Sequence, residues 1–133
     1  MSIENDFAVA LLAALIDEPA LAATINRFGD SAFEAGPDPA LWLTDVIGSE
    51  WGAKDRPGRE LRCGITISDF GPVERIATLT HAAENAALSL PRSIAGWECG
   101  GTVITRARMA RARDGQRIAS IDMRARLWRA PQA

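Results

Sequence analysis

The sequence predicts an α+β domain, with a four-stranded, mainly antiparallel sheet and helices packed on one face, in the order α-α-β-β-α-β-β. Apolar and polar residues alternate over residues 61–68, the period of a strand with one buried face. Over residues 73–90 the apolar residues instead recur at helical spacing. The chain has 133 residues, of which 47% are hydrophobic and 24% charged, and this fits a single globular domain spanning residues 1–133.

Two short helices are expected at the N-terminus. Phe7, Leu11 and Leu15 recur at four-residue spacing, and Pro19 ends this first helix. The second helix is predicted over residues 19–27, because proline is tolerated in a first helical turn. Together they form a nearly all-apolar helical hairpin.

The central part of the chain predicts two strands and the longest helix. Glycine and prolines in residues 29–40 indicate a loop. The run 41–47 is short, apolar and β-branched toward its end, which favours a strand. A polar turn at 54–58 precedes the alternating strand 61–68. The long helix begins after Pro72 and ends before Pro91, with small residues that allow close packing on a sheet.

The C-terminal third predicts a long β-hairpin around Asp114 and Gly115. A two-residue turn would set apolar residues opposite polar ones. A three-residue loop over residues 113–115, with Gly115 left-handed, instead pairs Arg106 with Asp122 and is favoured for that reason. The same register sets three apolar pairs opposite each other: Val103 with Ala125, Ala107 with Ile121, and Met109 with Ala119.

Charge is distributed unevenly along the chain, although the formal net charge is only -2. Residues 1–50 hold nine acidic side chains against Arg27, whereas residues 100–133 hold eight arginines against Asp114 and Asp122. This polarity can steer a partner, or copies of the same chain, toward each other.

Neither a disulfide framework nor a membrane segment is expected. Cys63 and Cys99 lie too far apart for a CxxC pair, which favours a reducing cytoplasm. The longest apolar run, residues 7–16, is too short to span a bilayer, and acidic residues precede it where a signal peptide would be basic.

The residue types needed for catalysis are sparse. His81 is the single histidine, there is no tyrosine, and the carboxylates form no convincing acid-base pair. We therefore expect no enzymatic activity, no metal site and no cofactor. The alternative, an enzyme, requires His81 to converge with a cysteine or a carboxylate in one pocket.

The arginines of the C-terminal hairpin form the most informative candidate surface. Four are predicted to share the face opposite the apolar one, and three lie near the tip. The candidate interface residues are Arg106, Arg108, Arg124 and Arg126 on the face, with Arg111, Arg113 and Arg117 near the tip. A solvated sheet face, a protein interface and nucleic-acid backbone binding remain open alternatives. The pI near 5.4 disfavours nucleic acid, although Trp128 with Arg124 and Arg126 is the one place where an aromatic residue is interleaved with arginines.

The chain resembles the tail terminator, or tail completion, proteins of long-tailed bacteriophages and phage-like gene transfer agents. The resemblance spans about residues 7–129. Four segments carry it: the paired helices 8–15 and 19–22, the turn into a strand at 57–62, the alanine-rich helix 73–90, and the closing hairpin 111–129. The chain departs from similar proteins in lacking tyrosine and in entering its first strand through Pro39 and Ala40.

This resemblance implies an α+β subunit that forms a hexameric ring on the head-proximal end of the tail tube. Such a ring ends tube polymerisation and presents a surface to the head-closure, or neck, proteins. The implied partners are further copies of the chain, the tube protein and a head-closure protein, with no membrane and no specific nucleic-acid contact. The implied location is the cytoplasm during assembly and then the tail–neck junction of the particle. Alternatives are another neck or tail component, or a small nucleic-acid-binding module.

Overall fold

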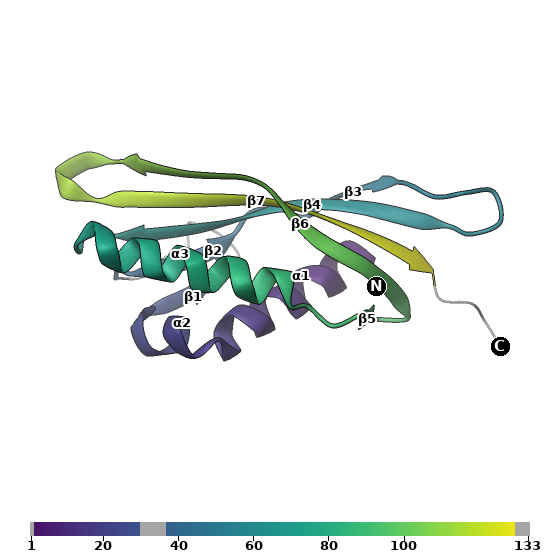
Figure 1. Ribbon diagram of the computed structural model, residues 1–133, viewed down its shortest axis with the longest axis horizontal. Helices are drawn as coiled ribbons and strands as arrows, with labels where there is room; N and C mark the ends of the chain where they lie inside the picture. The colour runs from purple at the N-terminus through teal and green to yellow at the C-terminus, as the bar shows by residue number, and fades with distance from the viewer. Residues whose placement is uncertain (1, 30–36, 130–133) are drawn as a thin grey trace.

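The computed structural model describes residues 2–29 and 37–129, which form one mixed sheet with helices on one of its faces (Figure 1). Its helices are α1 (Ile3–Asp17), α2 (Pro19–Thr24) and α3 (Val73–Leu88). Its strands are β1 (Arg27–Gly29), β2 (Ala40–Leu43), β3 (Ile47–Glu50), β4 (Gly58–Asp69), β5 (Ser93–Ile94), β6 (Trp97–Arg111) and β7 (Arg117–Arg129). The strand order is β1-β2-β4-β7-β6-β5, and β3 pairs with the first part of β4.

Side-chain hydrogen bonds to the first turns set where α1 and α2 begin. The side chain of Ser2 accepts a hydrogen bond from the backbone N–H of Asn5 and caps α1. The carboxylate of Glu18 accepts from two backbone N–H groups of the next turn and caps α2, in which Pro19 is the first residue. Between α1 and α2 the chain therefore changes direction without a loop.

One apolar core lies between the helices and the central strands β4 and β7. The alternating residues of β4, including Leu61, Ile65 and Ile67, are buried, as the period of two predicts. Phe7 and Leu11 of α1 belong to the same buried cluster. Since β7 lies between β4 and β6 and is antiparallel to both, β4 and β6 are parallel, and the chain between them contains α3 and the short strand β5.

The prediction of four strands is wrong, because the described residues form seven, and a parallel pair makes the sheet mixed. β1 and β5 have only three and two residues, too few to show a period. The expected strand 41–47 is two strands, β2 and β3. They separate at Thr44, whose Oγ1 accepts a hydrogen bond from the N–H of Gly64 at 2.7 Å.

The second helix is also shorter than predicted and ends at Thr24, since Arg27–Gly29 pairs with β2 as a strand. The loop expected over residues 29–40 lies largely outside the described residues, apart from its ends. Pro39 and Ala40 at its C-terminal end are buried.

The hairpin register is confirmed near its tip and wrong farther from it. A three-residue turn, Arg113–Gly115, connects β6 to β7, and Gly115 has a φ of 81°. Arg106 lies opposite Asp122 as expected, and Ala107 and Met109 face Ile121 and Ala119. Val103, however, lies opposite Arg124, because a register shift between Ile104 and Arg106 inserts one extra residue into β6.

The outer part of the hairpin extends to one end of the molecule (Figure 1). Residues 105–111 of β6 are all exposed, including the Ala107 and Met109 side chains expected to face the core. In the described residues β5 pairs only with the first two residues of β6, so the remaining edge of β6 is open. An open strand edge of this length offers backbone groups to a partner.

Candidate interaction surface

The four arginines predicted to share a face do so in the structure. Arg106 and Arg108 lie opposite Asp122 and Ser120 of β7, on the sheet face away from the helices, and both are exposed. Arg124 and Arg126 lie on the same face of β7 and are half-buried. Within the described residues, Arg106, Arg108 and Arg124 form no ion pair. These three charges therefore remain available to a partner.

Arg126 differs from the other three, because contacts within the chain occupy it. Its Nε donates to a carboxylate oxygen of Glu60 at 3.0 Å, and its guanidinium lies 4.7 Å from the centre of the Trp51 ring. Arg62 donates to the same carboxylate. The hydrogen bond from Arg126 is the main reason that the pKa of Glu60 lies below its ordinary value.

Two of the tip arginines, Arg111 and Arg117, have different environments. Arg117 donates from Nη1 to the backbone carbonyl of Gly71 at 3.0 Å, which ties the hairpin to the turn before α3. Arg111 is exposed and lies directly opposite Arg117, so two like charges face each other. Arg113 begins the turn at the tip. The repulsion between Arg111 and Arg117 favours a partner that brings negative charge.

Asp69, a buried carboxylate at the end of β4, positions the turn that precedes α3. Local sequence patterns did not identify it as a site residue. Asp69 is 1% exposed and accepts hydrogen bonds from Arg75 Nε at 2.8 Å, Arg75 Nη2 at 2.6 Å and the Gly71 N–H at 3.1 Å. Arg75 holds the pKa of Asp69 below its ordinary value. Since Arg117 binds the same turn at Gly71, Asp69 helps to hold the tip end of the hairpin against that turn.

Asp38 forms a second fixed point beside the hairpin tip. The hydroxyl of Ser68 donates to one of its carboxylate oxygens at 2.6 Å, and the side-chain amide of Gln116 donates to the other at 2.8 Å. Asp38 is 78 positions from Gln116 in the sequence, so no local pattern could have revealed the contact.

Tryptophans and arginines gather near the other end of the sheet. The rings of Trp51 and Trp128 lie 4.5 Å apart and tilted, and Arg56 lies 5.2 Å from the Trp128 ring while pairing with Glu98. The sequence associated Trp128 with Arg124 and Arg126, but Arg126 lies over Trp51 instead. The turn between β3 and β4 brings Trp51 and Arg56 to this cluster, a pairing that only the folded sheet creates.

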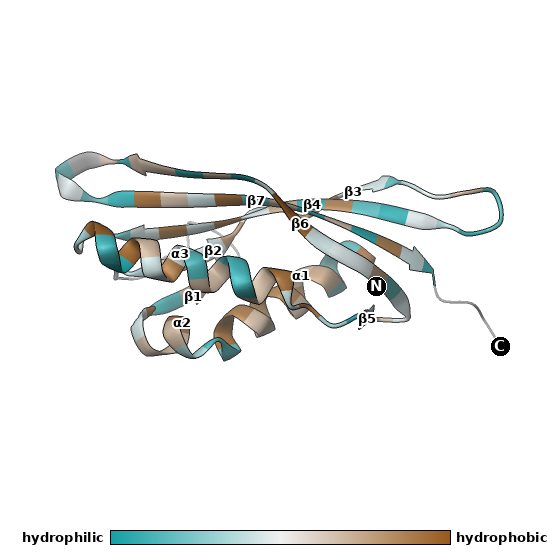
Figure 2. Ribbon diagram, viewed as in Figure 1, coloured by the Kyte–Doolittle hydropathy of each residue, from teal (hydrophilic) through white to brown (hydrophobic). Residues whose placement is uncertain are grey.

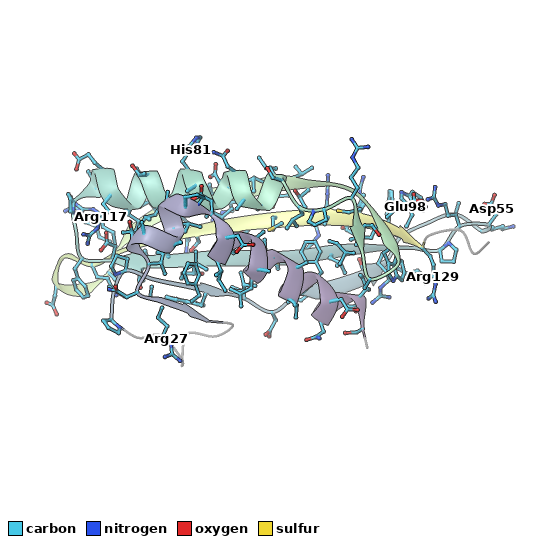
Figure 3. All side chains as sticks on the ribbon, turned by 90° about the horizontal axis from the view of Figure 1, so that it is seen from below. Arg27, Asp55, His81, Glu98, Arg117 and Arg129 are labelled. Atoms are coloured by element: carbon cyan, nitrogen blue, oxygen red, sulfur yellow. The ribbon has the colours of Figure 1, made fainter. Side chains whose placement is uncertain are left out.

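His81, Cys63 and Cys99, the residues considered for catalysis, have different environments. His81 is exposed on α3 (Figure 3), whereas burial raises the pKa of the Cys63 thiol to about 12. Cys99 is half-buried and lines a groove of about 430 Å³ with Leu88 and Arg92. Among the described residues, no three histidine, cysteine or acidic side chains are grouped so that they could hold a metal ion. None of the helices described is both long and apolar enough to cross a bilayer.

The fold is similar to that of a known virion chain. A chain in the solved structure described as "Virion of native gene transfer agent (GTA) particle" superposes on this chain with a TM-score of 0.77 and 17% sequence identity. The match covers 91% of this chain and 93% of that chain. No protein-family model matches the sequence, and no curated protein matches it. The protein therefore has the fold of a gene transfer agent virion chain over almost its whole length.

Proposed function

We propose that this protein is a structural component of a phage-like particle and acts as a tail terminator. In this role it caps the head-proximal end of the tail tube as a hexameric ring, ends tube polymerisation and joins the tail to the head. The observation that carries the proposal is the fold match to a gene transfer agent virion chain, which covers 91% of this chain and 93% of that chain. The terminator role within such a particle rests on the sequence resemblance.

The charge distribution supports assembly with other copies. A ring forms through heterologous contacts, in which two different patches of one subunit meet. Arg106 and Arg108 are exposed and form no ion pair in the described residues, and neither do Asp6 and Asp17 of α1. These oppositely charged regions supply such patches. The proposed partners are further copies, the tube protein and a head-closure protein, and the proposed role involves neither catalysis nor a cofactor.

Electron microscopy of negatively stained particles, from a producing host with and without this gene, tests the role. Without the gene we expect overlong tubes, or heads and tails that are not joined. The double variant R106E/R108E should fail to restore normal particles, because the two reversals remove the unpaired positive charge without touching the core. A variant with the same change in net charge at exposed positions elsewhere, R27E/K54E, should restore them. Normal particles without the gene would contradict the proposal.

The same images separate the alternatives among virion proteins. Loss of all tubes indicates a tube subunit, and tails of normal length without heads indicate a head-closure protein. A nucleic-acid-binding module is favoured only by the exposed Arg106 and Arg108, which form no ion pair in the described residues. Retention on DNA that weakens steeply with added salt, and that R106E/R108E abolishes, would support that function instead.

A further inference from the structure

From residue 7 to residue 16, helix α1 is apolar on all sides, although only one side faces the core. Every residue from 8 to 16 is apolar. The core side buries Phe7, Leu11 and Leu15, while the opposite side exposes Val9 at 62% and Ile16 at 44%. We call Val9, Ala13 and Ile16, all of which are exposed, the α1 stripe. A helix that is apolar all round is normally buried, so the α1 stripe indicates a covering partner.

Figures 2 and 3 show the apolar composition of α1 and its position on the helix side of the sheet. In Figure 2, α1 is coloured tan to brown along most of its length, with little hydrophilic colour. In Figure 3, which views the molecule from the helix side, α1 lies in front of the sheet and faces the viewer. This face is a place where a second molecule can bind.

A second apolar surface lies where the hairpin meets the start of α3. A groove of about 290 Å³ there is lined by Val73, Met109, Ala110, Arg111 and Arg117, and we call it the hairpin groove. Val73 and Met109 are each 42% exposed. Apolar side chains in the groove and two arginines at its lining suit a partner that is apolar at its centre and acidic at its edge.

The α1 stripe has this chemistry. Asp6 and Asp17 flank it, and no lysine or arginine precedes Arg27 in the chain. A helix that binds a lipid surface carries lysine and arginine on its polar side, so this helix favours a basic protein partner over a membrane. The chain itself supplies that partner surface, since Arg111 faces Arg117 and neither forms an ion pair in the described residues.

We propose that the α1 stripe of one copy binds in the hairpin groove of a second copy, with Asp17 beside Arg111. This inference rests on the ring-forming role proposed above and assigns its subunit contact. The two patches are different, so the contact is heterologous and can repeat around a ring. A stable interface covers about 800 Å² per partner, roughly a tenth of the 7664 Å² that this chain exposes. The exposed residues 105–111 of β6 beside the groove supply the remaining area.

Single substitutions in the purified full chain test this contact by sedimentation velocity. The wild type should form multimers, and I16D and M109D should each weaken association by about tenfold or more, because each places a charge in a buried apolar contact. The matched control is L88D, since Leu88 is 52% exposed in the last turn of α3, as Ile16 is in the last turn of α1. L88D should associate like the wild type. Circular dichroism checks that all variants are folded.

A charge exchange tests the direction of the contact. D17R and R111E should each weaken association by a few fold, and the double variant D17R/R111E should recover most of it. Each copy contributes both patches, so a single doubly substituted chain is sufficient.

Several results would overturn the inference. One is that the wild type stays monomeric at hundreds of micromolar. Another is that I16D and M109D associate normally, and a third is that D17R/R111E associates more weakly than both single variants. Binding of the wild type to phosphatidylglycerol vesicles, abolished by I16D, would assign the α1 stripe to lipid and overturn it too. Normal particles without the gene would refute the terminator role but leave the measured self-contact standing, so the two failures are distinguishable.

Discussion

The buried carboxylate of Asp69 gives the sharpest test of how the hairpin is positioned. Replacing it by asparagine keeps the shape of the side chain and removes its charge. The amide still accepts a hydrogen bond on one oxygen, but its NH₂ group then faces the donor groups of Arg75, so at least one of the two bonds from Arg75 is lost.

The expected cost of D69N follows from those bonds. A hydrogen bond to a charged group contributes about 1.5 to 3 kcal/mol. The Arg75 side chain is 43% exposed and regains water when the bond breaks, so we expect a loss of about 1 to 2 kcal/mol. For a domain of this size that lowers Tm by roughly 4 to 8 °C, measured by calorimetry. D122N, the same change at an exposed carboxylate of β7, should alter stability by less than about 0.5 kcal/mol.

The pH dependence tests the same contact independently. Because Arg75 lowers the pKa of Asp69 in the folded state, the stabilisation is fully present above the ordinary aspartate pKa and is lost as pH falls through the lowered one. The free-energy difference between wild type and D69N should stay constant from pH 7 to about pH 5 and shrink in more acidic solution. A difference that grows below pH 4, or D69N as stable as the wild type at pH 7, would refute this account of the turn.

Three further outcomes are expected. L11A should lower the free energy of unfolding by about 3 kcal/mol in urea, because Leu11 is fully buried and a cavity would remain. Cys63 should resist alkylation in the native protein at pH 8, since burial raises its pKa to about 12, and Cys99 should react first as followed by mass spectrometry. G58A should lower Tm and change tryptophan fluorescence, because an added Cβ would collide with the backbone carbonyl of Trp51 in the β3–β4 hairpin.

Local periodicity was sufficient to predict the long elements. The alternation around Ile65, the helical spacing that ends at Pro91 and the turn at Gly115 each reflect a repeat or a backbone preference within a few residues. Cys63 belongs to the apolar set of the same alternation and is buried. The short strands could not be found in this way, because β5 has only two residues and exists through its pairing with β6.

The arginine face was predictable in part. The alternation in β7 placed Arg124 and Arg126 on one side of the sheet, as observed. Whether each arginine remains available to a partner depends on residues that are distant from it in the sequence. Glu60 and Trp51 occupy Arg126, whereas Arg106 keeps its exposure. Side-chain pairing across strands depends on sheet order, which local sequence does not contain.

The sequence alone determined the α+β class, the main helices and strands, the tip of the hairpin and the separation of acidic from basic charge, because each of these is set by neighbouring residues. Tertiary structure decided the seven-stranded order, the register shift before Arg106, the anchoring of the hairpin through Asp69 and Arg117, and the exposed sides of α1 and β6. These features arise from contacts between distant segments, whose formation depends on how the whole chain closes around its core.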